Sequence, residues 1–207
     1  MHQLGILLAA GYGRRFQALQ PNSNKLLAPL GDHGCVAATS LHNLRQAVDH
    51  VMVVIRPNSP ELKQQLSQPH CTVIESEQAH TGMGASLADA ARALLERYNS
   101  SPVKNVLVTL ADMPCISLQS FHSVQSALNH ATIAAPLYQG QRGHPVGFQW
   151  HLIPELTTLC GDEGARRLVQ QHGIQHVPCT DAGVCFDIDE PNDLLHPTLH
   201  SFLRSRS

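Results

Sequence analysis

The sequence predicts an α/β protein, a three-layer α/β/α sandwich with a mostly parallel central sheet, formed as one domain over residues 1–207. Short runs rich in β-branched residues alternate along the chain with longer segments of helical periodicity. The short runs show little alternation of apolar and polar residues, which is typical of parallel strands covered on both faces. Repetition of strand, helix and strand favours right-handed crossovers, with helices on both faces of the sheet.

The elements follow in order from these patterns. The expected strands are residues 4–9, 50–55, 71–75, 105–110, 131–136 and 174–178. Apolar residues at three- and four-residue intervals predict helices over residues 35–48, 59–66, 84–98, 117–129 and 162–172. Ser59 and Ser117 are expected N-caps, and Asp162 is a third candidate cap. The glycine-rich stretch 138–148 is expected to be a turn.

The composition excludes several classes of function. The chain has 14 Lys and Arg against 16 Asp and Glu, which leaves no basic excess for binding a nucleic acid. No apolar run approaches the roughly 20 residues of a membrane-spanning helix, and the N-terminal run has the features of a strand rather than a signal peptide. A cytoplasmic protein is expected. The six cysteines form no C-x-x-C pair, so reduced and mostly buried thiols are expected.

The loop "GYGRRF" after the first strand is a candidate phosphate-binding loop. Gly11 and Gly13 leave room for a ligand to approach the backbone. Phe16 replaces the third glycine of a dinucleotide fingerprint, the expected acidic residue about 20 positions on is missing, and no Walker sequence is present. Arg14, Arg15 and Lys25 instead suit the oxygens of a triphosphate, although a solvated arginine pair on a surface turn is the alternative.

Carboxylates are expected at the same edge of the sheet. Asp112 directly follows the fourth strand in "LVTLADMP", and "FDIDEPND" places Asp187 and Asp189 two residues apart, on one face of an extended segment. Carboxylates beside a triphosphate loop favour Mg²⁺, which prefers oxygen ligands and completes its shell with substrate phosphates. A lone aspartate here could equally cap a turn.

Taken together, these motifs resemble the MobA-like nucleotidyltransferase family, which includes the molybdopterin guanylyl- and cytidylyltransferases. The opening motif matches Leu8 to Phe16 and then Lys25, the central metal motif matches Asp112 to Pro114, and the late motif matches Asp187 to Asp193. The segments "GMGASL", "QRGHPVGF" and "GDEGARRL" resemble the cytidylyltransferase branch. The resemblance implies a Rossmann-like fold of the nucleotide-diphospho-sugar transferase type. It also implies transfer of CMP from CTP, or of the corresponding group from GTP, to molybdopterin, with release of pyrophosphate.

The resemblance also implies roles for particular residues. It makes Arg15, Lys25 and Asp112 catalytic and Asp112 and Asp189 the Mg²⁺ ligands. It assigns the acceptor side to Arg142, Gly143, His144 and Asp187. It assigns nucleotide binding to residues around the end of the first strand and to later positions: Leu8, Ala9, Ala10, Gly11, Gly13, Arg15, Lys25, Gly82 and Ser86. A molybdenum hydroxylase is a possible partner.

Three alternatives remain open at the level of the sequence. The eight residues 17–24 make the spacing between Phe16 and Lys25 longer than the family's pattern, so this loop either bulges away or moves Lys25 off the phosphates. In the second case the chain is a non-catalytic carrier that binds the molybdenum cofactor and helps insert it into a molybdenum enzyme. An NAD(P)-dependent oxidoreductase is disfavoured by Phe16 and by the missing acidic residue.

Overall fold

The computed structural model describes residues 2–162 and 164–205, which form the expected α/β architecture around one sheet. In these residues eight strands follow the order β3-β2-β1-β4-β7-β5-β6, and β8 pairs with β5. The strands are β1 (His2–Ala9), β2 (His50–Ile55), β3 (Cys71–Glu75), β4 (Val103–Leu110), β5 (Ile133–Tyr138), β6 (Gln141–Arg142), β7 (Val146–Gln149) and β8 (Gln175–Pro178). The mostly parallel three-layer arrangement predicted from the sequence is confirmed.

The register of the central strands brings their carboxyl ends to one edge. Strand β1 lies between β2 and β4 and is parallel to both, with Leu8 opposite Val54 on one side and Leu110 on the other. The Ala111 N–H donates to the Leu8 carbonyl oxygen at 3.0 Å, which holds the start of the next loop against β1. The loops after β1 and β4 therefore emerge side by side.

The second half of the sheet contains two antiparallel strands. Strand β7 is antiparallel to both β4 and β5, and the short β6 is antiparallel to β5. The prediction of a turn over residues 138–148 was therefore wrong for β6 and β7, although residues 139–140 do form the turn between β5 and β6. Strand β7 has only four residues, and its Gly147 lies so close to α5 that an added Cβ would be 2.7 Å from Leu128 and 2.8 Å from Val124. A short run built around such a glycine gives no strand periodicity.

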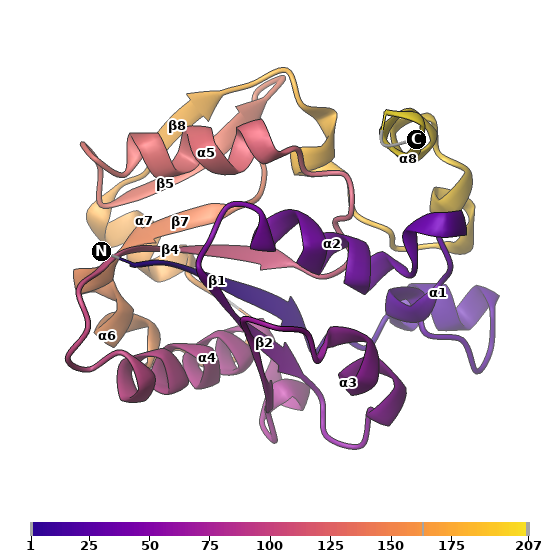
Figure 1. The fold of residues 1–207 in the computed structure, drawn as a ribbon, viewed down its shortest axis with the longest axis horizontal. Helices are drawn as coiled ribbons and strands as arrows, with labels where there is room; N and C mark the ends of the chain where they lie inside the picture. The colour runs from indigo at the N-terminus through magenta and orange to yellow at the C-terminus, as the bar shows by residue number, and fades with distance from the viewer. Residues whose placement is uncertain (1, 163, 206–207) are drawn as a thin grey trace.

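Helices cover both faces of the sheet (Figure 1). Helices α2 (Val36–Arg45), α3 (Pro60–Leu66) and α5 (Leu118–Ala127) pack on one face, and α4 (Met83–Arg97), α6 (Ile153–Leu156) and α7 (Arg166–His172) pack on the other. Each face has its own hydrophobic core. The apolar face of each helix is what fixes it there, since burial of a large aliphatic side chain contributes about 1.5–3 kcal/mol.

Two further helices lie beyond the carboxyl edge of the sheet. Helix α1 (Arg14–Leu19) follows the glycine loop, and α8 (Pro197–Arg204) ends the described chain at the same end of the molecule (Figure 1). A third hydrophobic cluster joins them, with Phe16, Ile188 and Leu199 almost completely buried in it. Phe16, which stands where a dinucleotide fingerprint has glycine, is therefore a core side chain.

Of the three predicted caps, Ser117 is confirmed, Ser59 is confirmed in position only, and Asp162 was wrong. Ser117 caps α5 as expected, because its Oγ accepts the Ser120 N–H at 3.3 Å. Ser59 stands at the N-cap of α3, but its hydroxyl donates to the Pro57 carbonyl oxygen and bonds no helical N–H. Helix α7 begins at Arg166 with Ala165 at its N-cap, so Asp162 does not cap it.

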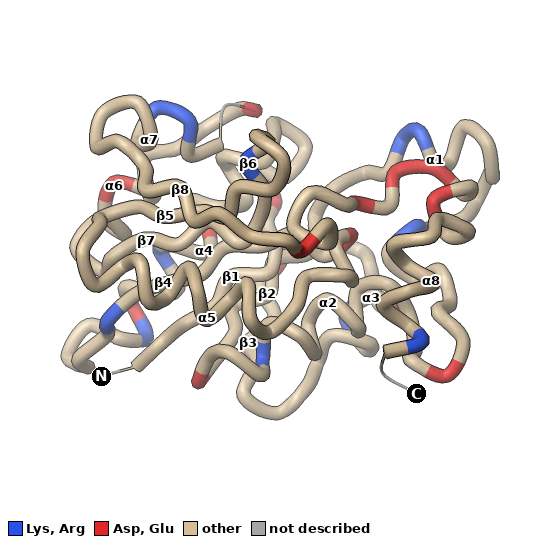
Figure 2. Tube along the Cα trace, turned by 90° about the horizontal axis from the view of Figure 1, so that it is seen from above, with Lys and Arg blue, Asp and Glu red and all other residues tan. Residues whose placement is uncertain are grey.

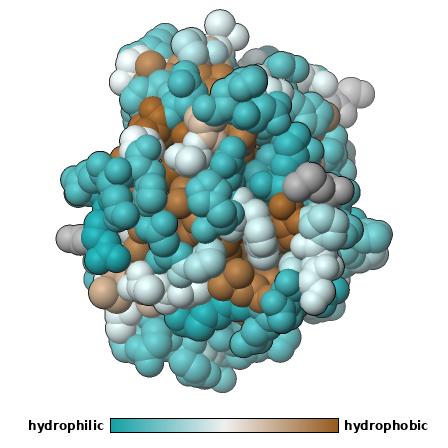
Figure 3. All heavy atoms as spheres, turned by 90° about the vertical axis from the view of Figure 1, so that its left-hand side faces the viewer, coloured by the Kyte–Doolittle hydropathy of each residue, from teal (hydrophilic) through white to brown (hydrophobic). Residues whose placement is uncertain are grey.

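The remaining features agree only in part with the expectations. All six cysteines are free, but only Cys35 and Cys115 are buried. Among the described helices, none combines the length and the apolar character needed to cross a bilayer. The end of the molecule away from α1 and α8 carries hydrophobic side chains interleaved with hydrophilic ones (Figure 3).

Candidate active site

A cavity of about 430 Å³ opens at the carboxyl edge of the sheet, between the loop after β1 and the start of α4. Cavities of this size hold small-molecule ligands. Most of the residues singled out in the sequence line it: Leu8, Ala10, Gly11, Gly13, Arg15, Lys25, Gly82, Ser86, Asp112 and Asp189. Ala9 is an exception, because its side chain belongs to the core under α2.

Lys25 is the central cation of this cavity. Its Nζ lies 2.7 Å from Asp112 Oδ2 and 2.9 Å from Asp189 Oδ1, and the residue is only 7% exposed. The preceding Asn24 accepts the Leu26 N–H and so starts the short 3-10 helix Lys25–Leu27. Residues 17–19 complete α1, residues 20–24 join it to this 3-10 helix, and the longer spacing leaves Lys25 in the cavity wall.

Arg15 reaches one of these two carboxylates, that of Asp189, from the first turn of α1. Its Nη1 lies 2.7 Å from Asp189 Oδ2, although 72% of the Arg15 side chain is exposed. Gly13 makes this turn possible, since its φ of 61° lies in the left-handed region that favours glycine. Figure 2 shows the basic turn of α1 beside the acidic C-terminal segment. An exposed ion pair of this kind is worth only about 0–1 kcal/mol, so Arg15 can exchange Asp189 for a phosphate at little cost.

The three predicted carboxylates form one cluster. Asp112, Asp187 and Asp189 each offer an oxygen atom, and these three atoms lie within 4.8 Å of one another. Asp112 Oδ1 is buried and, among the described residues, has no hydrogen-bond partner. A buried carboxylate oxygen without a partner is costly unless something fills the position. The donor set and this oxygen fit a divalent cation such as Mg²⁺ or Mn²⁺.

The pKa values of the cluster follow from its charges. Partial burial raises the pKa of Asp187, and repulsion from Asp189 and Asp112 raises it further. Burial also opposes ionisation of Asp189, but Lys25 and Arg15 outweigh it and lower the pKa of that carboxyl. For Lys25, burial lowers the pKa, yet the carboxylates of Asp112 and Asp189 reverse this and raise it above 10.5. Lys25 is thus firmly charged.

Two glycine-containing segments that are far apart in the sequence meet at the other wall of the cavity. The Gly84 N–H donates to the Gly161 carbonyl oxygen at 2.8 Å. Gly82 has a φ of 134°, and a Cβ there would lie 2.3 Å from the Gly161 carbonyl carbon. Asp162 lines the cavity beside it. The sequence contained both segments, but nothing in it signals their contact.

Two side chains missed in the sequence, Tyr12 and Arg56, pack together beside the cavity. Tyr12 lines the cavity, with the Arg56 guanidinium carbon 4.6 Å and the Arg14 carbon 5.6 Å from its ring centroid. His80 and Met83 also line it, together with Leu26, Ala79 and Leu110. Arg56 directly follows β2, and this position at the carboxyl edge of the sheet was the one sequence signal that could have placed it near the site.

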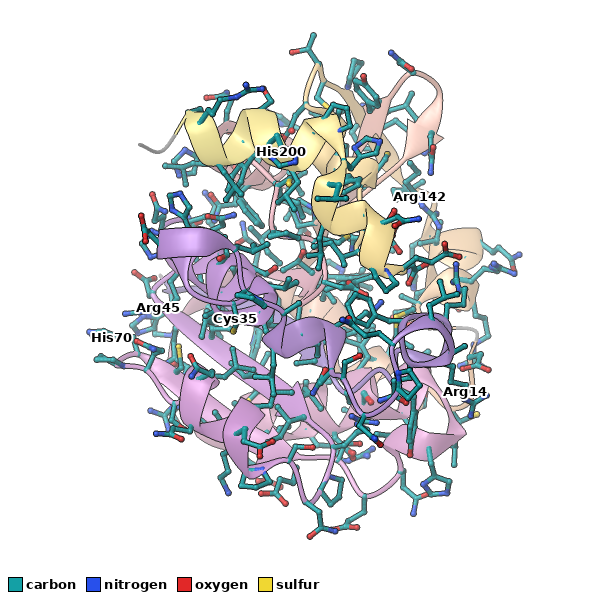
Figure 4. All side chains as sticks on the ribbon, turned by 90° about the vertical axis from the view of Figure 1, so that its right-hand side faces the viewer. Arg14, Cys35, Arg45, His70, Arg142 and His200 are labelled. Carbon is teal, nitrogen blue, oxygen red and sulfur yellow. The ribbon has the colours of Figure 1, made fainter. Side chains whose placement is uncertain are left out.

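The residues expected to face the acceptor lie outside the cavity wall. Arg142 is exposed on β6, and Figure 4 shows it on the same side of the view as Arg14. A Cβ on Gly143 would lie 2.1 Å from the Val184 carbonyl oxygen, so close backbone packing explains this glycine. His144 is half-buried, with Nδ1 3.4 Å from the Val108 carbonyl oxygen. Burial lowers the pKa of His144 despite the attraction of Asp112, which favours a neutral ring.

Gly11 provides a test of ligand approach that does not disturb the fold. A Cβ at this position meets no atom within 4 Å, and Gly11 does not have a positive φ. We expect Gly11→Ala to keep or slightly raise the melting temperature, because it lowers the entropy of the unfolded chain. The Kd for a nucleoside triphosphate, measured by calorimetry, should rise at least tenfold because the methyl group enters the cavity. An unchanged Kd would place the ligand away from this backbone.

The fold and the cavity together define a class of protein. It is a three-layer α/β/α protein with a mostly parallel sheet, and a glycine loop, a buried lysine and a carboxylate cluster lie at the sheet edge where such folds bind ligands. The model of the MobA-like NTP transferase domain matches residues 5–177, and the chain belongs to that family.

Known proteins resemble this chain in sequence or in fold. The purine catabolism protein PucB of Bacillus subtilis (strain 168) is 28% identical over 200 residues, which are 92% of this chain and 93% of PucB. A nucleotidyl transferase from Methanothermobacter superposes with a TM-score of 0.78 at 21% identity, over 99% of both chains. Rv0371c of Mycobacterium tuberculosis H37Rv, solved in a complex with manganese, gives a TM-score of 0.66 at 21% identity, over 86% of this chain and 88% of that one.

Proposed function

We propose that this protein is a Mg²⁺-dependent nucleotidyltransferase that transfers CMP from CTP to molybdopterin and releases pyrophosphate. The observation that carries the proposal is Lys25, which bridges Asp112 and Asp189 inside a cavity that the glycine loop also lines. A cation, a carboxylate pair and a glycine backbone at one sheet edge are what transfer of a nucleotidyl group requires. Family membership supports the nucleotidyl transfer. The acceptor and the base are proposed from the motifs shared with the cytidylyltransferase branch.

The carboxylate cluster is the proposed metal site. Asp112, through the Oδ1 that no described residue contacts by a hydrogen bond, and Asp189 would hold the ion, and Asp187 lies close enough to contribute a further oxygen. When bound, Mg²⁺ would offset the charge of the reacting phosphate and orient it for in-line attack. The manganese complex of Rv0371c supports a divalent ion in this type of protein.

Lys25 and Arg15 are the proposed triphosphate ligands. Both contact Asp189, so each would exchange a carboxylate for a phosphate oxygen when the nucleotide enters. The backbone from Leu8 to Gly13 would pass under the nucleotide, while Gly82 and Ser86 would lie near the base or the ribose. Ser86 is buried on the first turn of α4 and lines the cavity.

The proposed reaction needs no obligatory general base. An oxygen atom of the acceptor phosphate, already anionic, forms the bond to the α-phosphorus, and the bond between the α-phosphorus and the oxygen bridging to the β-phosphate breaks. Pyrophosphate leaves with the electron pair of that bond. Arg142 is an exposed cation that could guide the acceptor phosphate, whereas a neutral His144 would act through hydrogen bonding.

The test is release of pyrophosphate in the presence of Mg²⁺ and molybdopterin, with CTP, GTP, ATP and UTP assayed separately. We expect release with CTP and little with the purine nucleotides. Silence with every nucleotide, beside an active cytidylyltransferase as positive control, would remove the proposal. Calorimetry then identifies a carrier, which would bind the molybdenum cofactor without measurable affinity for Mg²⁺ and CTP together.

A further inference from the structure

Asp193 lies close to the proposed metal site but does not belong to it. Its Oδ2 accepts the N–H of Asp189 at 2.8 Å and the N–H of Glu190 at 2.7 Å. One carboxylate oxygen therefore fixes the backbone of the residue whose side chain is a proposed metal ligand. The proline at position 191 begins the 3-10 helix Pro191–Leu195, so the chain turns away directly after this contact.

The other side of the same segment is held by apolar packing and by one backbone bond. The Ile188 N–H donates to the Asp112 carbonyl oxygen at 2.9 Å, which ties the two acidic segments together. The Ile188 side chain is fully buried in the cluster that contains Phe16 and Leu199. Helix α8 supplies Leu199, and it lies beyond residues 5–177, which the family model matches.

We infer that Asp193 is a positioning residue that orients the Asp189 carboxylate toward Asp112, with α8 as its apolar support through Leu199. This inference rests on the proposed metal site. Metal ligands must be held within about 0.5 Å of productive geometry, and side chains that orient them change metal affinity about 10–100-fold when lost. Asp189 sits in an extended segment between two anchored points, so removal of one anchor frees its backbone.

The test measures Mn²⁺ binding by electron paramagnetic resonance, without acceptor and without turnover. We expect Asp193→Ala to raise the Mn²⁺ Kd about 10–100-fold. Asp193→Asn keeps an oxygen that can accept both N–H groups, so it should restore most of the affinity. Leu199→Ala should raise the Kd in the same direction by a smaller factor, because α8 can no longer hold the segment firmly.

Asp181 provides a matched control. Its carboxylate also accepts a backbone N–H, that of Gly183 at 2.9 Å, and Asp181 is the N-cap of a 3-10 helix, Ala182–Cys185. Asp181→Ala should lower the melting temperature but leave the Mn²⁺ Kd unchanged. A role of Asp193 in stability alone would give the same pattern for both variants.

Three outcomes would overturn the inference. Equal Mn²⁺ Kd values for Asp193→Ala and the wild type would remove it. Equal weakening by Asp193→Asn and Asp193→Ala would assign the effect to charge rather than to hydrogen bonding. If Asp193→Ala does not fold, the other two variants decide. The inference is then wrong if the Mn²⁺ Kd is unchanged in both Asp193→Asn and Leu199→Ala. It is also wrong if Asp193→Asn weakens Mn²⁺ binding as much as was expected for Asp193→Ala. Wild-type protein that binds Mn²⁺ but releases no pyrophosphate would contradict the proposed function and leave this inference standing.

Discussion

Substitution of Asp112 by asparagine is expected to lower the rate of pyrophosphate release by about 10³-fold, equivalent to ~4 kcal/mol of transition-state stabilisation. Asparagine keeps the shape of the side chain but loses the charge that a divalent cation requires. Asp112 Oδ1, which has no hydrogen-bond partner within residues 2–162 and 164–205, is the oxygen most clearly available to such an ion. The melting temperature should change little, because the loss of attraction to Lys25 is offset by relief of repulsion from Asp187 and Asp189.

A matched control uses a carboxylate far from the cavity. Asp49 is exposed and accepts the Gln3 N–H at 2.8 Å near the start of β1. Asp49→Asn should retain the full rate of pyrophosphate release under the same conditions. Full activity in Asp112→Asn would refute its assignment as the principal metal ligand.

The central parallel strands could be predicted from the sequence because burial on both faces leaves a local signal. Residues 51–55 are apolar throughout, and the structure places β2 at residues 50–55. Strand β7 could not be predicted, since its four residues owe their pairing to β4 and β5 rather than to their own pattern. Tertiary packing, rather than the local sequence pattern, therefore makes these four residues a strand.

The candidate site likewise has features that could be predicted from the sequence and features that could not. The rule that ligands bind at the carboxyl ends of parallel strands was enough to bring Gly11 and Asp112 together, whereas the place of Lys25 was left open by the long spacing after Phe16. The contact of Gly82 with Gly161 could not be foreseen, because it joins two loops about 80 positions apart through backbone atoms. The role of Phe16 was likewise hidden, since its partners Ile188 and Leu199 come from the far end of the chain.

Substitution of Lys25 by methionine is expected to move nucleotide and metal affinity in opposite directions. The Kd for CTP should rise about 10–100-fold, because a charged hydrogen bond of about 1.5–3 kcal/mol to the triphosphate is lost. The Kd for Mn²⁺ without nucleotide should instead fall several-fold. In the wild type the Lys25 ammonium already occupies oxygens of both Asp112 and Asp189, and an incoming metal ion must compete with it. Calorimetry with CTP and paramagnetic resonance with Mn²⁺ measure the two effects separately.

The pH dependence of stability gives a further check on the same variant. Burial opposes ionisation of Asp189, but Lys25 and Arg15 lower the pKa of this carboxyl when the protein is folded. Its stabilising contribution is therefore present above the unfolded pKa and is lost as the pH falls through the folded value. Lys25→Met should be destabilised at neutral pH, where three carboxylates repel, and its stability should approach that of the wild type in acid.

Lys63→Met is the control for the two affinities. It removes an exposed partner of Glu75 at 2.8 Å and should change neither the CTP Kd nor the Mn²⁺ Kd. A parallel loss of CTP and Mn²⁺ affinity in Lys25→Met would mean that Lys25 supports the carboxylates instead of competing with the metal.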